Sequence, residues 1–286
     1  MKELCQQFGP ERRLIGILTE PSGCTPRLGL VLVSAGLLPK FGPYRLYAEL
    51  ARRLAHEAIA TLRFDLGGIG DSAQEYEQRP LKERTALEIK AAIDHLCERH
   101  EFDGIALAGL CSGAEDAFRA AEADPRVTDV VMIDPFAYRT AGWAARNLLH
   151  RARRRALRAL GVYQPLPIAG DDQPRLVNYK YMDRPEAMHA LETLLARETG
   201  VHFVYTAGAR EMFNHERQLR AQFSPISLGD RVTLDYFPQI DHTQLLEADR
   251  RALIEAIAKR LQDSLKQSAP RNRRAQFSTR TEIGSF

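Results

Sequence analysis

A Gly-Leu-Cys-Ser-Gly pentapeptide at positions 109–113 holds the side chains with the clearest potential for chemistry. It follows an apolar run over 104–108 and precedes a helix-like segment over 114–123. A sharp turn between a strand and a helix presents the side chain at its centre to a reacting group. That central residue is Cys111, whose thiolate can attack an acyl carbon. The pattern therefore predicts covalent acyl chemistry.

The spacing of small residues around the turn indicates which side chain is the nucleophile. The turn bends so sharply that the positions two before and two after the nucleophile must be small. Gly109 and Gly113 flank Cys111 at this spacing, whereas a nucleophile at Ser112 would place Leu110 at the tightest point. We therefore favour Cys111. The alternative is an ordinary turn with an inert cysteine, because free cysteine is among the most buried residue types.

A cysteine nucleophile needs a base, and His242 follows the last predicted strand, over 232–237. We interpret the other histidines as surface or core side chains. A carboxylate must accept a hydrogen bond from the imidazole and stabilise the imidazolium that forms. The two candidates are Glu211, after a predicted strand over 202–205, and Asp134, at the end of the strand over 127–133.

Two backbone N–H groups are expected to form an oxyanion hole, which stabilises the charge that develops on an attacked carbonyl oxygen. One belongs to Ser112, the residue after the nucleophile. The other belongs to the loop after the apolar run over 29–33, where Leu37 is the best candidate. Side chains matter little for this role because backbone groups perform it.

Apolar strands and amphipathic helices alternate along most of the chain. The alternation predicts an α/β fold with a mostly parallel sheet and helices on both faces. It lapses over 141–198, which we interpret as a helical lid inserted into the fold. The predicted divisions are 1–140 for the first part of the core, 141–198 for the lid, 199–265 for the second part of the core and 266–286 for a disordered basic tail.

The composition suits one large core. A chain of 286 residues with 44% hydrophobic residues can bury an α/β core with an inserted subdomain. No window approaches the apolar length of a membrane span, and residues 1–7 lack the apolar core of a signal peptide, so we expect a cytoplasmic protein. The four cysteines show neither zinc-site spacing nor a disulfide framework. No metal and no organic cofactor is expected.

The net charge of +3 is too small to indicate binding to nucleic acid, but the basic residues are unevenly distributed. One cluster lies in a predicted helix and the other in the tail. Both are compatible with a solvated surface, and the alternative is a docking surface for an acidic partner or an anionic substrate. The two clusters are Arg151, Arg153, Arg154, Arg155 and Arg158, and Arg271, Arg273, Arg274 and Arg280.

Several motifs, in this order, resemble the α/β-hydrolase superfamily. They are Ala35-Gly36, Leu62 to Asp65 with Gly68 to Ser72, the turn at Cys111, and Asp241-His242. More narrowly, the segments over 42–47 and 109–111 resemble bacterial hydrolases found alongside exosortase and natural-product systems. The resemblance covers about residues 29–261 and implies an α/β-hydrolase fold with the chain order nucleophile, acid, histidine. It favours Glu211 over Asp134, because Glu211 stands where the superfamily has Gly-x-x-Asp.

A cysteine in place of serine makes the acyl-enzyme a thioester, and exchange between thioesters is nearly isoenergetic. We therefore expect a hydrolase that acts on a small acyl ester or thioester. One alternative is acyl or aminoacyl transfer between carrier-protein thiols, with an acidic carrier protein bound by Arg151, Arg153, Arg154 and Arg155. Another is a non-catalytic binding module, which is indicated if Cys111, His242 and a carboxylate do not converge.

Overall fold

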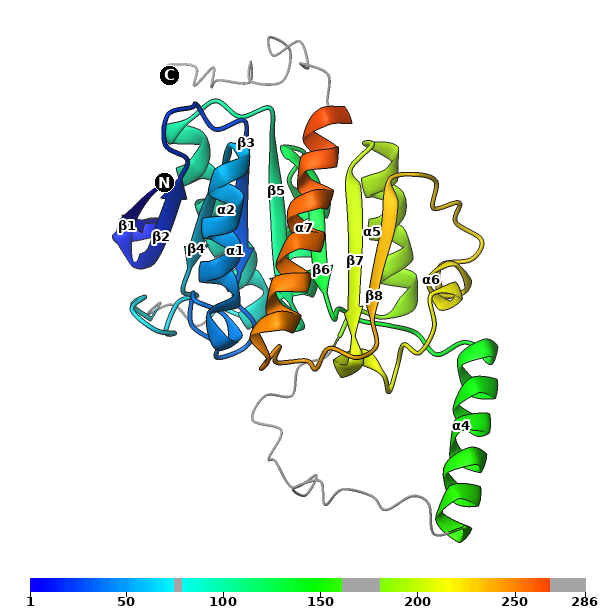
Figure 1. Ribbon diagram of the computed structural model, residues 1–286. Helices are drawn as coiled ribbons and strands as arrows, with labels where there is room; N and C mark the ends of the chain where they lie inside the picture. Colours follow the sequence, from blue (N-terminus) through cyan, green and yellow to red (C-terminus); the bar gives the residue numbers. More distant parts are fainter. Residues whose placement is uncertain (75–78, 161–180, 268–286) are drawn as a thin grey trace.

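Eight strands form one sheet at the centre of the protein (Figure 1). This computed structural model describes residues 1–74, 79–160 and 181–267. The strands are β1 (Lys2–Phe8), β2 (Leu14–Glu20), β3 (Leu28–Val33), β4 (Ile59–Phe64), β5 (Gly104–Leu110), β6 (Val127–Ile133), β7 (Gly200–Thr206) and β8 (Val232–Phe237). Across the sheet their order is β1-β2-β4-β3-β5-β6-β7-β8. Neighbours from β4 to β8 pair in parallel, whereas β1 with β2 and β2 with β4 pair antiparallel.

The central strands are buried along their whole length because helices cover both faces of the sheet. All residues of β3, β4 and β7 are buried, as is typical of strands in a doubly covered parallel sheet. Val33 of β3 is in register with Gly109 of β5, and Leu110 of β5 with Ile133 of β6. The carboxyl ends of these three strands therefore lie level with one another at one edge of the sheet.

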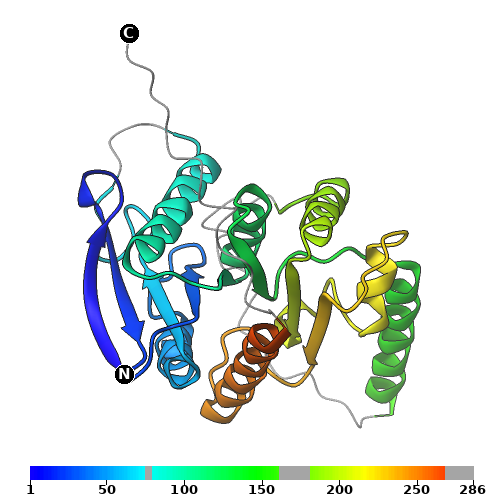
Figure 2. The ribbon, with the colours of Figure 1, turned by 90° about the horizontal axis from the view of Figure 1, so that it is seen from above.

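Helices pack against the sheet from both sides (Figure 2). The helices are α1 (Leu46–Leu54), α2 (Leu81–Arg99), α3 (Ser112–Ala123), α4 (Ala141–Ala159), α5 (Arg184–Ala196), α6 (Arg217–Gln222) and α7 (Glu247–Gln267). The apolar cluster under α1 and α7 lies on one face, and the larger cluster under α2, α3 and α5 lies on the other. The predicted fold class, a mostly parallel sheet with helices on both faces, is confirmed.

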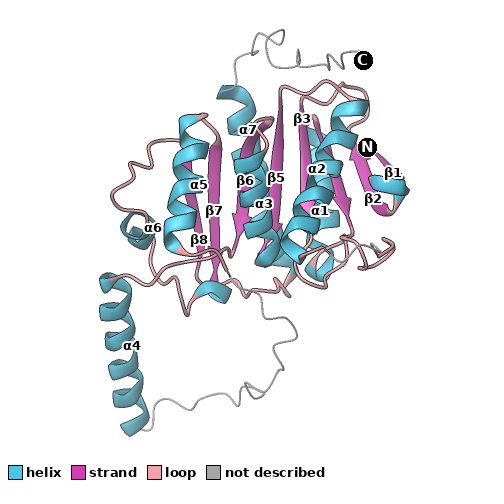
Figure 3. Ribbon diagram, turned by 180° about the vertical axis from the view of Figure 1, so that it is seen from behind, coloured by secondary structure: helices cyan, strands magenta, loops and turns pink. Residues whose placement is uncertain are grey.

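The segment predicted as a lid over 141–198 contains two helices with different surroundings. Helix α4 projects away from the sheet (Figure 3), and none of its residues is buried. Helix α5 instead packs against α3 and contributes Leu191 and Leu194 to the core. Helix α5 therefore belongs to the helical layer on the sheet, although it lies within the range predicted for the insertion. The stretch over 161–180 and the basic tail from 268 onward lie outside the described residues.

Three further observations on the described residues concern membrane-spanning helices, disulfide bonds and metal sites. No helix within them combines the length and the apolar character needed to cross a bilayer. All four cysteines are unpaired, and Cys5 and Cys24 are exposed. Across these ranges, no cluster of three or more histidine, cysteine or acidic side chains is placed to hold a metal ion.

Candidate active site

Cys111 occupies a strained turn between β5 and α3. Its backbone angles are φ 55° and ψ −120°, which a non-glycine residue rarely adopts. Its N–H donates to the carbonyl of Ile133 at 2.8 Å. A Cβ atom at Gly113 would lie 2.5 Å from the carbonyl oxygen of Val33, and one at Gly109 would overlap the Gly113 carbonyl. Close backbone packing therefore requires the small residues on both sides of Cys111.

His242 pairs with Asp134 and not with Glu211. Its Nδ1 atom lies 2.8 Å from Oδ2 of Asp134. The carboxylate also accepts hydrogen bonds from the N–H of Thr206 at 2.6 Å and from its hydroxyl at 2.5 Å. Glu211 is exposed, and its backbone carbonyl accepts a hydrogen bond from Arg139. The expected pairing of the histidine with Glu211 is thus not found, because the residue after β6, rather than the loop after β7, presents its carboxylate to the imidazole.

A glycine allows the histidine loop to approach the loop after β7. A Cβ atom at Gly208 would lie 2.5 Å from the Cβ atom of His242. The N–H of Ala207 donates to the carbonyl of Ile240 at 2.7 Å, which ties the two loops together. Gly208 therefore makes room for His242. Gly208 is also the glycine of the Gly-x-x-Asp pattern that led us to favour Glu211, but here the glycine serves the approach of the histidine loop.

Cys111 and His242 form an acid–base pair. Hydrogen bonds with Asp134, first, and with Cys111 raise the pKa of His242 to about 10. Burial opposes ionisation of Cys111, but hydrogen bonds from His242, Tyr181 and the Ser112 N–H outweigh burial and hold the pKa of the thiol below its usual value. Both shifts favour transfer of the thiol proton to the imidazole, which gives a thiolate–imidazolium pair.

A cavity of about 450 Å³ opens beside Cys111 and His242. Its lining is largely apolar and consists of Ala35, Gly36, Leu38, Phe41, Gly42, Pro43, Tyr44, Leu110, Cys111, Ser112, His242 and Thr243. Leu37 lies in the turn between two of these residues, and the N–H of Gly36 donates to the Ser112 hydroxyl at 3.0 Å. That bond joins the loop after β3 to the start of α3. The backbone N–H groups of Leu37 and Ser112 therefore belong to two segments that meet beside Cys111.

No model of a protein family matches this sequence, and no curated protein matches it. Solved structures do match over most of the chain. DcsB in complex with its substrate analogue aligns with a TM-score of 0.58 at 16% identity, over 94% of this chain and 100% of that chain. Est1E from Butyrivibrio proteoclasticus with bound ferulic acid gives 0.57 at 14% identity, over 88% and 96%. A dienelactone hydrolase from Anabaena variabilis gives 0.57 at 16% identity, over 90% and 95%. The chain has the α/β-hydrolase fold.

In the α/β-hydrolase fold, the nucleophile stands on the turn after a central strand, and the acid and the histidine follow later in the chain. Here Cys111 follows β5, Asp134 follows β6 and His242 follows β8. The three residues therefore occur in the order that the resemblance implies. The arrangement differs from the favoured expectation in one respect: the carboxylate is Asp134, after β6, and not Glu211, after β7.

A tyrosine that the sequence analysis did not single out also contacts Cys111 in this α/β-hydrolase fold. The hydroxyl of Tyr181 lies 3.1 Å from Cys111 Sγ. Tyr181 precedes α5 and is not among the residues that line the cavity. No signal in the sequence marks it, because it lies outside the alternation of strands and helices and 70 residues away from Cys111.

A buried carboxylate anchors the loop that forms one wall of the cavity. Asp65, which follows β4, is fully buried. It accepts hydrogen bonds from both the backbone N–H and the ammonium group of Lys40 at 2.6 Å. The N–H of Asp71 also donates to Asp65 at 3.0 Å. This carboxylate therefore joins the loop after β3 to the glycine-rich loop after β4, where a Cβ atom at Gly70 would overlap it.

Proposed function

We propose that this protein hydrolyses acyl esters or thioesters through a covalent intermediate on Cys111. The observation that carries the proposal is the convergence of Cys111, His242 and Asp134 beside an apolar cavity. A hydrogen-bonded chain of thiol, imidazole and carboxylate activates a nucleophile for acyl transfer. The same convergence favours an enzyme over a non-catalytic binding module with this fold.

In the first half of the proposed reaction, the Cys111 thiolate attacks the acyl carbonyl carbon, and the carbonyl electrons move onto oxygen. The N–H groups of Ser112 and Leu37 stabilise the resulting oxyanion. As the tetrahedral intermediate collapses, the His242 imidazolium gives a proton to the leaving thiolate or alkoxide. Asp134 accepts a hydrogen bond from Nδ1 throughout and holds the ring in orientation. The acyl group is then bound to Cys111 as a thioester.

Water completes the cycle. The neutral His242 takes a proton from a water molecule, and the water oxygen attacks the thioester carbon. The second tetrahedral intermediate collapses and expels the Cys111 thiolate, so that the carboxylic acid is released. The thiolate–imidazolium pair is thereby restored.

Thioesters suit this chemistry better than esters or amides do. Acyl transfer from a thioester to Cys111 exchanges one thioester for another, whereas transfer from an ester or amide is uphill. A cavity of about 450 Å³ with a largely apolar lining has the size and character of a small-molecule site. Among the matching structures, one holds ferulic acid and another is a dienelactone hydrolase. These likenesses support a small acyl substrate for this protein.

Turnover of a panel of short-chain acyl thioesters and aryl esters tests the proposal. We expect Cys111→Ala and His242→Ala to lose turnover while their circular dichroism spectra match that of the wild type. Cys111→Ser is expected to retain weak activity at most, because a hydroxyl ionises far less readily than a thiol. Cys24→Ala serves as the control, because Cys24 is exposed and unpaired. Full turnover by Cys111→Ala would refute the proposed nucleophile.

A second candidate function, transfer of acyl groups between carrier-protein thiols, is favoured by α4. This helix projects from the fold with Arg151, Arg153 and Arg155 exposed, and Leu148 and Leu149 on the same helix are also exposed. Basic side chains next to exposed apolar ones suit an acidic protein partner. In this version the thiol of a carrier protein takes the place of water in the second half of the reaction.

Charge reversal on α4 distinguishes the two functions. We combine Arg151→Glu, Arg153→Glu and Arg155→Glu. Carrier docking predicts unchanged turnover of a small soluble thioester, but transfer from an acyl-loaded carrier protein slower by about tenfold or more. It also predicts that wild-type transfer weakens as the salt concentration rises. Equal transfer by the wild type and the variant would contradict docking at α4 and leave hydrolysis as the function.

A further inference from the structure

The short segment over 181–183, which precedes α5, lies against the side chain of Cys111. Its first residue, Tyr181, places its hydroxyl 3.1 Å from Sγ. Tyr181 is 37% exposed as a residue, so its hydroxyl is held at the sulfur although the residue is not fully enclosed. A long side chain in this situation needs a fixed backbone to keep such a contact.

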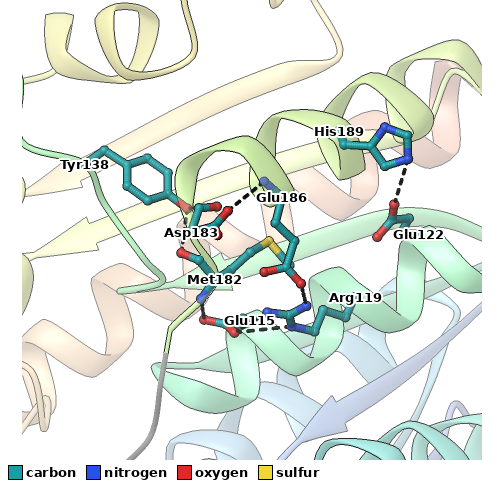
Figure 4. A network of polar contacts seen from close by, with 8 residues as sticks. All are labelled: Glu115, Arg119, Glu122, Tyr138, Met182, Asp183, Glu186 and His189. Carbon is teal, nitrogen blue, oxygen red and sulfur yellow. Dashed lines mark hydrogen bonds and ion pairs between the residues drawn. The ribbon is translucent and has the colours of Figure 1, made fainter.

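A buried glutamate on the helix that follows Cys111 fixes that backbone (Figure 4). Glu115 has no exposed surface, and its Oε2 atom accepts a hydrogen bond from the N–H of Met182 at 2.8 Å. Its other oxygen accepts from Arg119 at 3.0 Å. A buried charge is retained at a cost unless it is paired and hydrogen-bonded, and Glu115 satisfies both conditions. The residue next to Tyr181 is therefore held directly by the helix that begins at Ser112.

Further contacts hold the same segment from the other side (Figure 4). The hydroxyl of Tyr138 lies 2.9 Å from the carbonyl oxygens of both Met182 and Asp183. Asp183 caps α5 by accepting from the N–H of Glu186 at 3.0 Å. The side chain of Glu186 in turn pairs with Arg119, whose guanidinium therefore bridges α3 and α5. These bonds fix the N–H and the carbonyl of Met182, the residue beside Tyr181.

We propose that Tyr181 is a catalytic residue whose hydroxyl donates a hydrogen bond to the Cys111 sulfur and stabilises its thiolate. In the same proposal, the buried Glu115 is the positioning residue that fixes Tyr181 there through the backbone of Met182. The proposal rests on the function proposed above, in which Cys111 is the nucleophile.

The direction of this hydrogen bond follows from the chemistry of the two groups. A thiolate has no proton to give, so the tyrosine must donate. Burial, together with the charge on Cys111, raises the pKa of Tyr181, so its hydroxyl keeps its proton at neutral pH. The hydroxyl of Tyr47, which also lies near Cys111, instead donates to the carbonyl of Val33 at 2.9 Å.

Several titratable groups surround the sulfur and determine its ionisation together. His242 donates to it from the loop after β8, with Asp134 behind the imidazole, and Tyr181 donates from the segment before α5. Glu115 of α3 and Tyr47 of α1 lie close enough to act on this cluster electrostatically. A test must therefore separate the effect of Tyr181 from that of the histidine.

The test is the pH dependence of Cys111 alkylation by iodoacetamide, measured by mass spectrometry of the peptide that contains Cys111. The quantity compared is the pH at which the rate is half-maximal. A hydrogen bond to a charged group corresponds to a change of about one to two pH units, so we expect Tyr181→Phe to raise this midpoint by that amount. Tyr236→Phe is the control, because Tyr236 of β8 is also partly buried but does not line the cavity beside Cys111. A Tyr181→Phe midpoint equal to that of the wild type would overturn the proposal.

Variants of Glu115 test the positioning role. Glu115→Gln keeps an oxygen that can accept from Met182 and is expected to keep the wild-type midpoint, whereas Glu115→Ala is expected to match Tyr181→Phe. The double variant Glu115→Ala/Tyr181→Phe should show no further rise, because both changes remove the same bond. If Glu115→Ala does not fold, Tyr138→Phe loosens the same segment and should shift the midpoint in the same direction. Additive shifts would show that Glu115 does not act through Tyr181.

Alkylation needs no acyl substrate, so this test remains valid whatever the turnover experiments give. Absence of turnover with every acyl donor would count against the proposed function while the alkylation midpoints can still be compared. An unchanged midpoint in Tyr181→Phe, beside normal thioester turnover in the wild type, would overturn the role of the tyrosine alone.

Discussion

Replacement of Asp134 with asparagine isolates the contribution of the carboxylate to this site. Asp134 has a φ of 46°, which asparagine tolerates better than most residues do, so we expect the variant to fold. The Thr206 N–H can donate to Oδ1 of the asparagine as it does to Asp134. The amide Nδ2 would then face Nδ1 of His242 and donate to it. The substitution therefore imposes the opposite tautomer on the ring and removes the negative charge beside it.

The size of the effect follows from the bond that is lost. A hydrogen bond between charged groups contributes about 1.5–3 kcal/mol, which corresponds to a fall of about one to two in the pKa of His242. Because 41% of the His242 side chain is exposed, solvent screening favours the lower part of this range. The thiolate of Cys111 loses the same stabilisation from its cationic partner. A rise of about one unit in the pKa of Cys111 lowers its thiolate fraction by up to tenfold, so we expect the rate of acylation at pH 7 to fall by about tenfold.

Single-turnover acylation by a thioester, followed across pH, measures this loss. In the wild type the rate rises as Cys111 ionises, at a pH below the usual range of a thiol because its pKa is lowered. It falls again as the pH rises through about 10, because His242 then loses the proton that the leaving group needs. In Asp134→Asn the rising limb moves to higher pH and the falling limb to lower pH, so the profile narrows.

Glu211→Gln is the matched control for this experiment, because Glu211 is the other carboxylate that the sequence favours and is exposed in the structure. We expect its pH profile to coincide with that of the wild type. A wild-type profile in Asp134→Asn, or a comparable loss in Glu211→Gln, would refute the assignment of Asp134 as the partner of His242.

Two further predictions concern the loops that position the site. Gly109→Ala is expected to lower the free energy of unfolding in urea by about 3 kcal/mol or more, because the new Cβ would overlap the backbone carbonyl of Gly113; a stability equal to that of the wild type would contradict this. Lys40→Met leaves the buried Asp65 without its ammonium partner, and we expect it to lower the free energy of unfolding, measured by thermal denaturation, by about 3 kcal/mol. Asp71→Asn changes an exposed carboxylate and is expected to leave the melting temperature unchanged.

The turn at Cys111 could be predicted because its requirements are local. A Cβ atom at Gly109 would overlap the carbonyl of Gly113, so this requirement lies within the turn. Gly113 also packs against Val33 of β3, but the spacing of the two glycines is visible in the sequence alone. The strands over 127–133 and 232–237 could be predicted for a similar reason. A continuous or alternating run of apolar residues can be recognised within a few residues of sequence.

The choice between Asp134 and Glu211 depends on tertiary structure. Both residues follow strands whose carboxyl ends meet at one edge of the sheet, so order along the chain leaves both possible. The left-handed backbone at Asp134 and the two donors of Thr206 direct the carboxylate to His242. The contact with Thr206 exists only because β6 pairs with β7, with Ile133 in register with Val204.

The segment around Tyr181 lies beyond local reasoning for a different reason. The alternation of strands and helices lapses between β6 and β7, and a helix such as α5 looks the same in sequence whether it covers a sheet or forms a lid. Packing against α3 places α5 in the layer that covers the sheet, and Tyr181, just before α5, lies next to Cys111. The buried Glu115 accepts a hydrogen bond from the N–H of Met182, next to Tyr181, and no pattern in the sequence indicates this contact between residues 67 apart.

The most direct test of the central claim is intact-mass spectrometry of the protein after brief exposure to acyl thioesters. We expect the wild type to gain the mass of one acyl group, with peptide mapping to Cys111, and we expect Cys111→Ala to gain none. Decay of the adduct in water indicates hydrolysis, and decay only after addition of a carrier thiol indicates transfer. An adduct of equal yield on Cys111→Ala, or on a residue other than Cys111 in the wild type, would contradict the account.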